Sequence, residues 1–370
     1  MKKLAIYPYS RDMLDFVVWA QRFTDEYEIN GLYAPSGLGL SDMDAAYGQN
    51  RGDTGILVSR DLERMYTESD ALLVPSGDLQ AIMNCRVLDV LETAAARHLP
   101  VLCAMELGDK REHIEKVFSE ADTSICFLTD QNKSLEDPIL DRYTATNAYG
   151  LYQTKATVIM VGGLYADCCD REAALALVDG FRRAGHKATA IVSGDEAFML
   201  GLYPYPASFF SKEKEVEQRA ASLNRYLRHI DQRESPEVIV VQLLGGLIPF
   251  NKRFPESYGI KPFIAAQAIL PDFLVLGTLY MTYGIDLMES LKPVLRNRFG
   301  ATMLCTYMSN RFANVTESTE YPTLIFDYFD YPDYRKEFAE LSNDPSLPVF
   351  DITDVKDAER LADYVVNVLQ

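Results

Sequence analysis

The first 150 residues alternate short apolar runs with amphipathic stretches. The runs have the length of buried strands, and the stretches between them place apolar residues at helical spacing. The predicted strands are 4–9, 28–35, 71–77 and 100–105, and the predicted helices are 12–23, 85–98 and 109–121. This β-α order predicts a mainly parallel sheet with helices on both faces, as in Rossmann-like and flavodoxin-like domains.

A polar passage at 129–150 lacks clear periodicity, and we expect the domain boundary inside it or at its end. The predicted domains are therefore 1–150 and 151–370. The second repeats the α/β order, with apolar runs at 156–163, 187–194, 237–246, 272–280, 301–309 and 323–329. Among its helices, 170–184 has Asp170 as its predicted N-cap and Gly185 as its stop signal. The C-terminal helix follows Thr353 or Asp354 as cap and is amphipathic.

Composition narrows the function classes. The chain has 370 residues, of which 48% are hydrophobic, so it has enough apolar residues for two cores. Its formal net charge of -18 opposes binding to nucleic acids and anionic membranes. It is compatible with a cationic peptide or protein partner, although simple solubility of the protein is the favoured explanation.

Targeting and metal-binding signals are not evident. Polar residues interrupt the first apolar run, and no window approaches the roughly 18 apolar residues of a membrane span. The six cysteines lack paired spacing, which favours a reducing cytoplasm, and the four histidines form no metal-binding motif. We therefore expect a cytoplasmic protein without a metal or another cofactor.

The stretch VIMVGGLYADCCDREAALALVDGFRRAG, 158–185, has the strand, glycine turn and helix of a phosphate-binding loop. Such a loop reads G-x-x-x-x-G-K-S/T, because a Lys neutralises the phosphates and a hydroxyl ligates magnesium. Counted from Gly162, the last three positions are Asp167, Cys168 and Cys169. Counted from Gly163 they are Cys168, Cys169 and Asp170, and an acid there repels a triphosphate.

A second strand, VIVVQLLGGLIPF at 238–250, carries Gln242 near the place of a magnesium-binding acid, followed by Gly245 and Gly246. This strand and turn resemble those of dethiobiotin-synthetase-like P-loop proteins, as does the order of the glycine turn, the helix ending RRAG and the strand KATAIVSG. The resemblance covers 156 to about 370. It implies a P-loop-like fold, while this sequence lacks the catalytic motif residues.

Three segments together, MKKLAIYPYS, VGGLYADCCDREAALALVDGFRRAGHK and GGLIPFN, resemble a family of clostridial peptide maturation system proteins. Such proteins are associated with radical-SAM enzymes in gene cassettes for modified ribosomal peptides. The resemblance covers nearly the whole chain and brings no catalytic residues. It implies a role in handling a short precursor peptide.

Several candidate residues have both a functional and a structural explanation. Cys168 and Cys169 are either a reactive thiol site or small residues that fill a tight turn. Asp195 and Glu196 follow a strand and either bind a cation or amine, or cap a helix. The turns 36–40 and 75–77 follow strands and are candidates for holding a small anion. The aromatic segments 203–206, 208–210 and 326–334 suit either an interface, including a homodimer interface, or ordinary packing.

These observations favour an accessory protein that binds a peptide or a maturation enzyme without hydrolysing nucleotide. The alternative is a ligase or transferase with an unconventional nucleotide or small-molecule site in the cleft between the domains. We predict no catalytic residue. The predicted ligand pocket consists of Gly162, Gly163, Asp167, Cys168, Asp195, Gln242, Gly245 and Gly246.

Overall fold

The computed structural model describes residues 1–77, 86–136, 151–280, 285–320, 324–329 and 348–369. The chain divides into two compact units. Unit 1 contains Met1–Ser134 and Gly194–Pro204, and unit 2 contains Leu135–Ser193 and Tyr205–Gln370. The division after Ser134 lies within the polar passage 129–150, whereas segment 194–204 is grouped with unit 1 although it lies far along the sequence.

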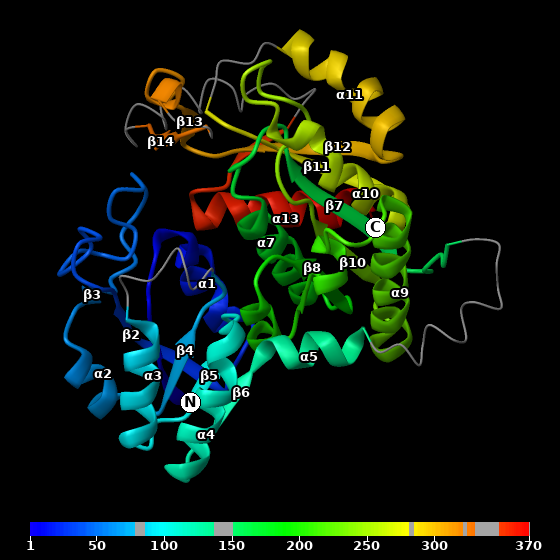
Figure 1. Cartoon of the computed structure of the whole chain (residues 1–370). Helices are drawn as coiled ribbons and strands as arrows, with labels where there is room; N and C mark the ends of the chain where they lie inside the picture. The colour runs from blue at the N-terminus through cyan, green and yellow to red at the C-terminus, as the bar shows by residue number, and fades with distance from the viewer. Residues whose placement is uncertain (78–85, 137–150, 281–284, 321–323, 330–347, 370) are drawn as a thin grey trace. The chain divides into compact units, whose positions relative to one another are not determined.

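Unit 1 is built on a six-stranded parallel sheet in the order β3-β2-β1-β4-β5-β6. This order is that of a dinucleotide-binding Rossmann sheet. The strands are β1 (Lys2–Ile6), β2 (Tyr27–Tyr33), β3 (Val58–Ser59), β4 (Ala71–Val74), β5 (Val101–Cys103) and β6 (Ile125–Phe127). The helices include α1 (Leu14–Trp19), α2 (Leu62–Glu68), α3 (Val87–Ala96), α4 (Arg111–Glu120) and α5 (Leu128–Leu135). Figure 1 shows α3 and α4 beside this sheet, in cyan.

Unit 2 has a second parallel sheet, whose strands lie in the order β15-β12-β11-β7-β10-β8. They are β7 (Thr157–Gly163), β8 (Ala188–Val192), β10 (Val238–Gln242), β11 (Phe273–Thr278), β12 (Thr302–Met308) and β15 (Val349–Asp351). The main helices are α7 (Asp170–Arg183), α9 (Val216–Glu234), α10 (Ile260–Ile269), α11 (Ile285–Phe299) and α13 (Val355–Leu369). Both units are therefore mainly parallel α/β folds with helices around each sheet, as predicted.

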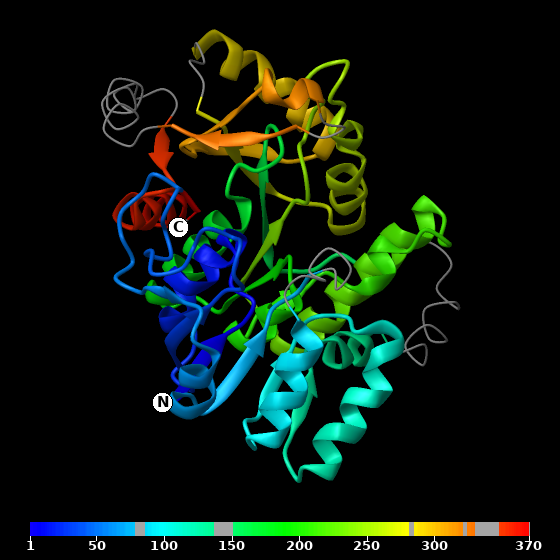
Figure 2. The same ribbon diagram turned by 60° about the vertical axis from the view of Figure 1, so that its left-hand side comes forward.

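The core of unit 2 follows from its sequence pattern. All five residues of β8 and all five of β10 are buried, as expected for strands covered on both faces. Helix α13 buries Ala358, Leu361, Ala362, Val365 and Val366 on one face. Figures 1 and 2 show α13, in red, beside α7. Asp354 accepts hydrogen bonds from the N–H groups of Lys356 and Asp357, which confirms Asp354 as the cap.

Some details differ from the predictions. The apolar run 323–329 is not a strand of the large sheet, because β14 (Phe326–Tyr328) pairs antiparallel with β13 (Arg311–Ala313). Helix α9 begins at Val216, where Glu215 and Gln218 form a capping box. Gly185, with φ 89°, ends α7 as predicted, and its N–H donates to the carbonyl of Arg182.

Candidate functional site

The candidate site of unit 2 lies at the carboxyl end of β7. This strand is flanked by β10 on one side and β11 on the other, so the order of the strands changes direction here. Ligands of open α/β sheets bind outside the carboxyl ends of the strands at such a point. The turn 164–169 follows β7, and α7 begins directly after it.

Two glycines of the predicted pocket, Gly162 and Gly163, are required by close packing. A Cβ on Gly162 would lie 2.9 Å from Leu243, and a Cβ on Gly163 would lie 2.4 Å from the carbonyl oxygen of Tyr165 and 2.7 Å from Cys168 Cβ. The turn therefore folds tightly back on the end of its own strand. Packing within the protein therefore requires glycine here. In a phosphate-binding loop, glycine at this place instead lets the ligand come close to the backbone.

The second predicted turn packs against the first. A Cβ on Gly246 would lie 3.0 Å from the backbone nitrogen of Ala166, and the N–H of Leu247 donates to the carbonyl of Gly163 over 3.0 Å. Gly245 has φ 86°, a left-handed conformation that favours glycine. The Gln242 side chain is buried and its Oε1 accepts from the N–H and the hydroxyl of Ser193, at 2.8 and 3.0 Å. Gln242 therefore ties β10 to the end of β8.

Asp170, the first residue of α7, places a buried carboxyl directly after the glycine turn. This carboxyl accepts a hydrogen bond from the Tyr307 hydroxyl over 2.5 Å. Burial raises the pKa of the Asp170 carboxyl to about 7, although Tyr307 and the backbone of Gly163 act in the opposite direction. The structure places Cys169 in the N-cap position, so the prediction that Asp170 is the N-cap is wrong.

Asp167 is also paired within the protein. Its carboxylate forms an ion pair with the guanidinium of Arg311, the first residue of β13. The Asp167 side chain is 42% exposed, whereas that of Arg311 is 12% exposed. Asp167 has φ 67°, a left-handed conformation that Asp tolerates better than most residues.

The thiol of Cys168 fills the inside of the turn. The residue is fully buried, and its Sγ lies 3.3 Å from the carbonyl oxygen of Tyr165. Burial raises the pKa of this thiol well above its ordinary value, with Asp170 adding to the effect. A thiol without access to solvent and without thiolate character is not a reactive site, which favours the packing explanation of Cys168.

Asp195 is the one predicted pocket residue in unit 1. Its Oδ1 accepts from Asn132 over 3.1 Å, and burial raises the pKa of its carboxyl to about 6. Gly194 is the N-cap of the short 3-10 helix that Asp195 begins, and neither residue provides a side-chain cap. The explanation of Asp195 as a helix cap is therefore wrong.

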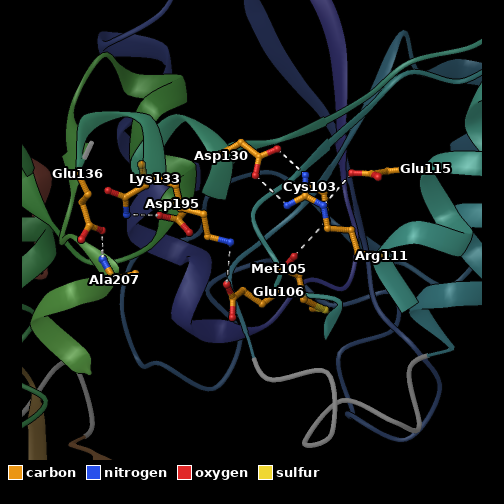
Figure 3. Close-up of polar contacts among 11 residues, drawn as sticks. Cys103, Met105, Glu106, Arg111, Glu115, Asp130, Lys133, Glu136, Asp195 and Ala207 are labelled. Atoms are coloured by element: carbon orange, nitrogen blue, oxygen red, sulfur yellow. Dashed lines mark hydrogen bonds and ion pairs between the residues drawn. The ribbon is translucent and has the colours of Figure 1, made fainter. Parts of the chain in front are cut away.

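The turn 75–77, a predicted anion-holding turn, holds a carboxylate of the chain itself. Glu196 accepts from the backbone N–H of Ser76 over 3.2 Å, and the Ser76 hydroxyl accepts from the N–H of Asp195 over 2.8 Å. Figure 3 shows the neighbouring charges. Lys133 Nζ lies 3.7 Å from Glu106, and the positive charge of Lys133 acts to lower the pKa of the Asp195 carboxyl. Ser76 follows β4, which pairs with β1 at the point where the strand order of unit 1 changes direction.

Sequence reasoning missed Tyr307 and Arg311. A tyrosine inside a mostly apolar strand such as ATMLCTYMS is one available signal, because its hydroxyl needs a buried partner. An arginine in the turn after the end of that strand is another. Within the residues that the structure describes, no three acidic, His or Cys side chains form a group that could hold a metal ion. No helix of the described chain is long and apolar enough to cross a membrane.

Comparison with known proteins supports the fold alone. No family model and no curated protein matches the chain. A crystal structure of a DUF1611 family protein from Anabaena variabilis is similar at a TM-score of 0.57 with 11% identity, and the match covers 99% of this chain and 100% of that one. The hydrogenase maturation factor HypB from Archaeoglobus fulgidus matches at a TM-score of 0.29 with 15% identity, over 65% of this chain and 100% of that one. A TM-score this low supports no argument.

Proposed function

We propose that this protein is an accessory protein in the maturation of a ribosomally made peptide, and that it binds the precursor peptide or a radical-SAM maturase without hydrolysing nucleotide. The observation that carries the proposal is the buried Asp170 carboxyl at the start of α7, directly after the glycine turn, where it accepts a hydrogen bond from the Tyr307 hydroxyl. The sequence resemblance to peptide maturation system proteins supports a peptide ligand, and an acid at this position argues against a nucleotide.

Asp170 opposes a bound phosphate in two ways. It takes the first position of the helix whose N-terminal N–H groups a phosphate-binding loop offers to its ligand. When ionised, it also places a negative charge where a triphosphate would add several more, without a Lys in the turn to offset them. The guanidinium of Arg311, which favours the charged form of Asp170, is paired with Asp167.

The remaining properties suit a partner-binding role in the cytoplasm. The described cysteines, five of the six, are free thiols, which is consistent with a reducing compartment. The net charge of -18 makes nucleic acid an unfavourable partner. Self-association into a homodimer through exposed aromatic side chains such as Phe210 is compatible with this role.

Two measurements test the proposal. We expect no hydrolysis of magnesium-ATP or magnesium-GTP by the purified chain above a no-protein blank, and sustained turnover would favour the ligase or transferase alternative. We also expect selection from a displayed library of random peptides to enrich related sequences. Failure to enrich any sequence family over an unselected library would contradict the peptide-binding part.

A further inference from the structure

Arg311 lies at the same carboxyl edge of the sheet as the glycine turn. It begins β13, three residues after β12 ends at Met308, and its guanidinium contacts Asp167 from that turn. The Arg311 side chain is 12% exposed, and its guanidinium lies 5.2 Å from the centre of the Tyr328 ring. A guanidinium so largely removed from water requires an anionic partner, and a carboxylate matches its planar donors.

Aromatic residues lie close to Arg311 in the backbone. Tyr328 is its partner in the β13–β14 pair, the rings of Tyr280 and Phe329 lie 4.2 Å apart, and those of Phe312 and Phe329 lie 6.2 Å apart. The N–H of Tyr280 donates to the carbonyl of Arg311 over 2.7 Å, which fixes the start of β13 beside the end of β11. All four aromatic residues are partly exposed, and the Tyr328 ring offers apolar contact area next to the guanidinium.

We propose that Arg311 is the carboxylate-binding residue for an acidic or C-terminal group of a peptide, and that Asp167 occupies its guanidinium until the peptide carboxylate replaces it. This inference rests on the proposed peptide-binding function and names the chemistry that the peptide presents. The exchange keeps the charge next to Arg311 constant, because one carboxylate leaves for water as another arrives. Asp167 is the partner suited to leave, because its own side chain is 42% exposed and its carboxylate is solvated by water once it is released.

Three synthetic peptides test the inference by calorimetric titration. The first, acetyl-Ala-Ala-Phe-Glu-amide, carries a side-chain carboxylate, and the second, acetyl-Ala-Ala-Phe-Gln with a free C-terminus, carries only the terminal one. The third, acetyl-Ala-Ala-Phe-Gln-amide, carries neither. We expect at least one of the first two to bind more tightly than the third, and the stronger of the two identifies the source of the carboxylate.

Two variants test the exchange. Asp167→Asn removes the internal competitor, so we expect it to tighten binding of the preferred carboxylate peptide about two- to fivefold. Arg311→Gln abolishes the preference for a carboxylate, whereas Lys252→Gln, an exposed cation in unit 2, keeps it. Equal binding of all three peptides to Asp167→Asn, or no binding at millimolar concentration, overturns the inference even if Arg311→Gln fails to fold. Nucleotide turnover would contradict the proposed function without changing these peptide results.

Discussion

Asp170 combines two demands that ordinarily conflict. Its carboxyl is removed from water, which favours the neutral form, and it accepts a hydrogen bond from the Tyr307 hydroxyl, which favours the charged form. Burial prevails, so the pKa of the group lies near 7, well above the ordinary value of a carboxyl. The stability of unit 2 is therefore linked to the protonation of this one side chain.

We expect Asp170→Asn to reduce the pH dependence of unfolding between about pH 4 and pH 7. Because the folded-state pKa is raised, the folded protein holds a proton in this range that the unfolded chain has released, and wild-type stability falls as pH rises. The free energy of unfolding of the variant, compared with that of the wild type, should rise by on the order of 1–4 kcal/mol between pH 4 and pH 8. Urea unfolding at several pH values measures this, with the exposed Asp25→Asn as control. If the pH dependence of unfolding is the same in Asp170→Asn as in the wild type, Asp170 is not the group whose raised pKa links stability to pH.

Removing the hydroxyl of Tyr307 tests the other half of the pair. Tyr307→Phe leaves the buried Asp170 carboxyl without one of its donors, which should cost about 1–3 kcal/mol of unfolding free energy. The loss should be larger at pH 8 than at pH 5, because the ionised carboxylate needs the donor more. Tyr258→Phe, at a side chain that is 62% exposed, should change stability by less than about 0.5 kcal/mol. Equal effects of the two substitutions would argue against the buried bond.

At the scale of elements, a close helix crossing holds the C-terminal helix in place. Gly180 in α7 faces Ala362 in α13, and a Cβ on Gly180 would lie 2.5 Å from the Cβ of Ala362. The small residue lets the two helices approach, so it serves packing although glycine disfavours a helix interior. The sequence predicted both helices but could not show that these two residues meet.

Gly180→Ala should therefore destabilise the protein by about 1–3 kcal/mol, although the same change in an exposed helix is stabilising. Chemical denaturation compares it with Gly52→Ala, a position where an added Cβ would meet nothing within 4 Å. A stabilised Gly180→Ala variant would show that α7 and α13 do not approach so closely.

At the scale of the whole molecule, the two α/β units were predictable because strand and helix periodicities are local. The buried runs at β7 and β10 and the amphipathic face of α13 follow directly from residue spacing. Contacts between distant residues were not predictable, and these decide the candidate site. The partners Asp170–Tyr307 and Asp167–Arg311 lie more than 130 residues apart in the sequence.

A common feature of the two sheets also emerged only from the structure. In each unit, a carboxylate of the chain lies near the point where the strand order changes direction: Glu196 accepts from the N–H of Ser76, and Asp170 begins the helix that follows the glycine turn. Gly162 and Gly163 resembled a phosphate loop because tight turns and phosphate loops need glycine for the same steric reason. The position of these glycines in the sequence could not show whether the turn faces a carboxylate of the chain itself or a bound anionic ligand.

Thermal unfolding of the wild-type protein with and without millimolar magnesium-ATP or magnesium-GTP tests the central claim most directly. A ligand that binds only the folded state at about one hundred times its Kd adds about 2.7 kcal/mol, enough to raise Tm by several degrees. Because the buried Asp170 carboxyl takes the helix start that a nucleotide phosphate would need, we predict no change in Tm with either nucleotide. A reproducible rise of several degrees would contradict the claim that this acid excludes a phosphate from the glycine turn.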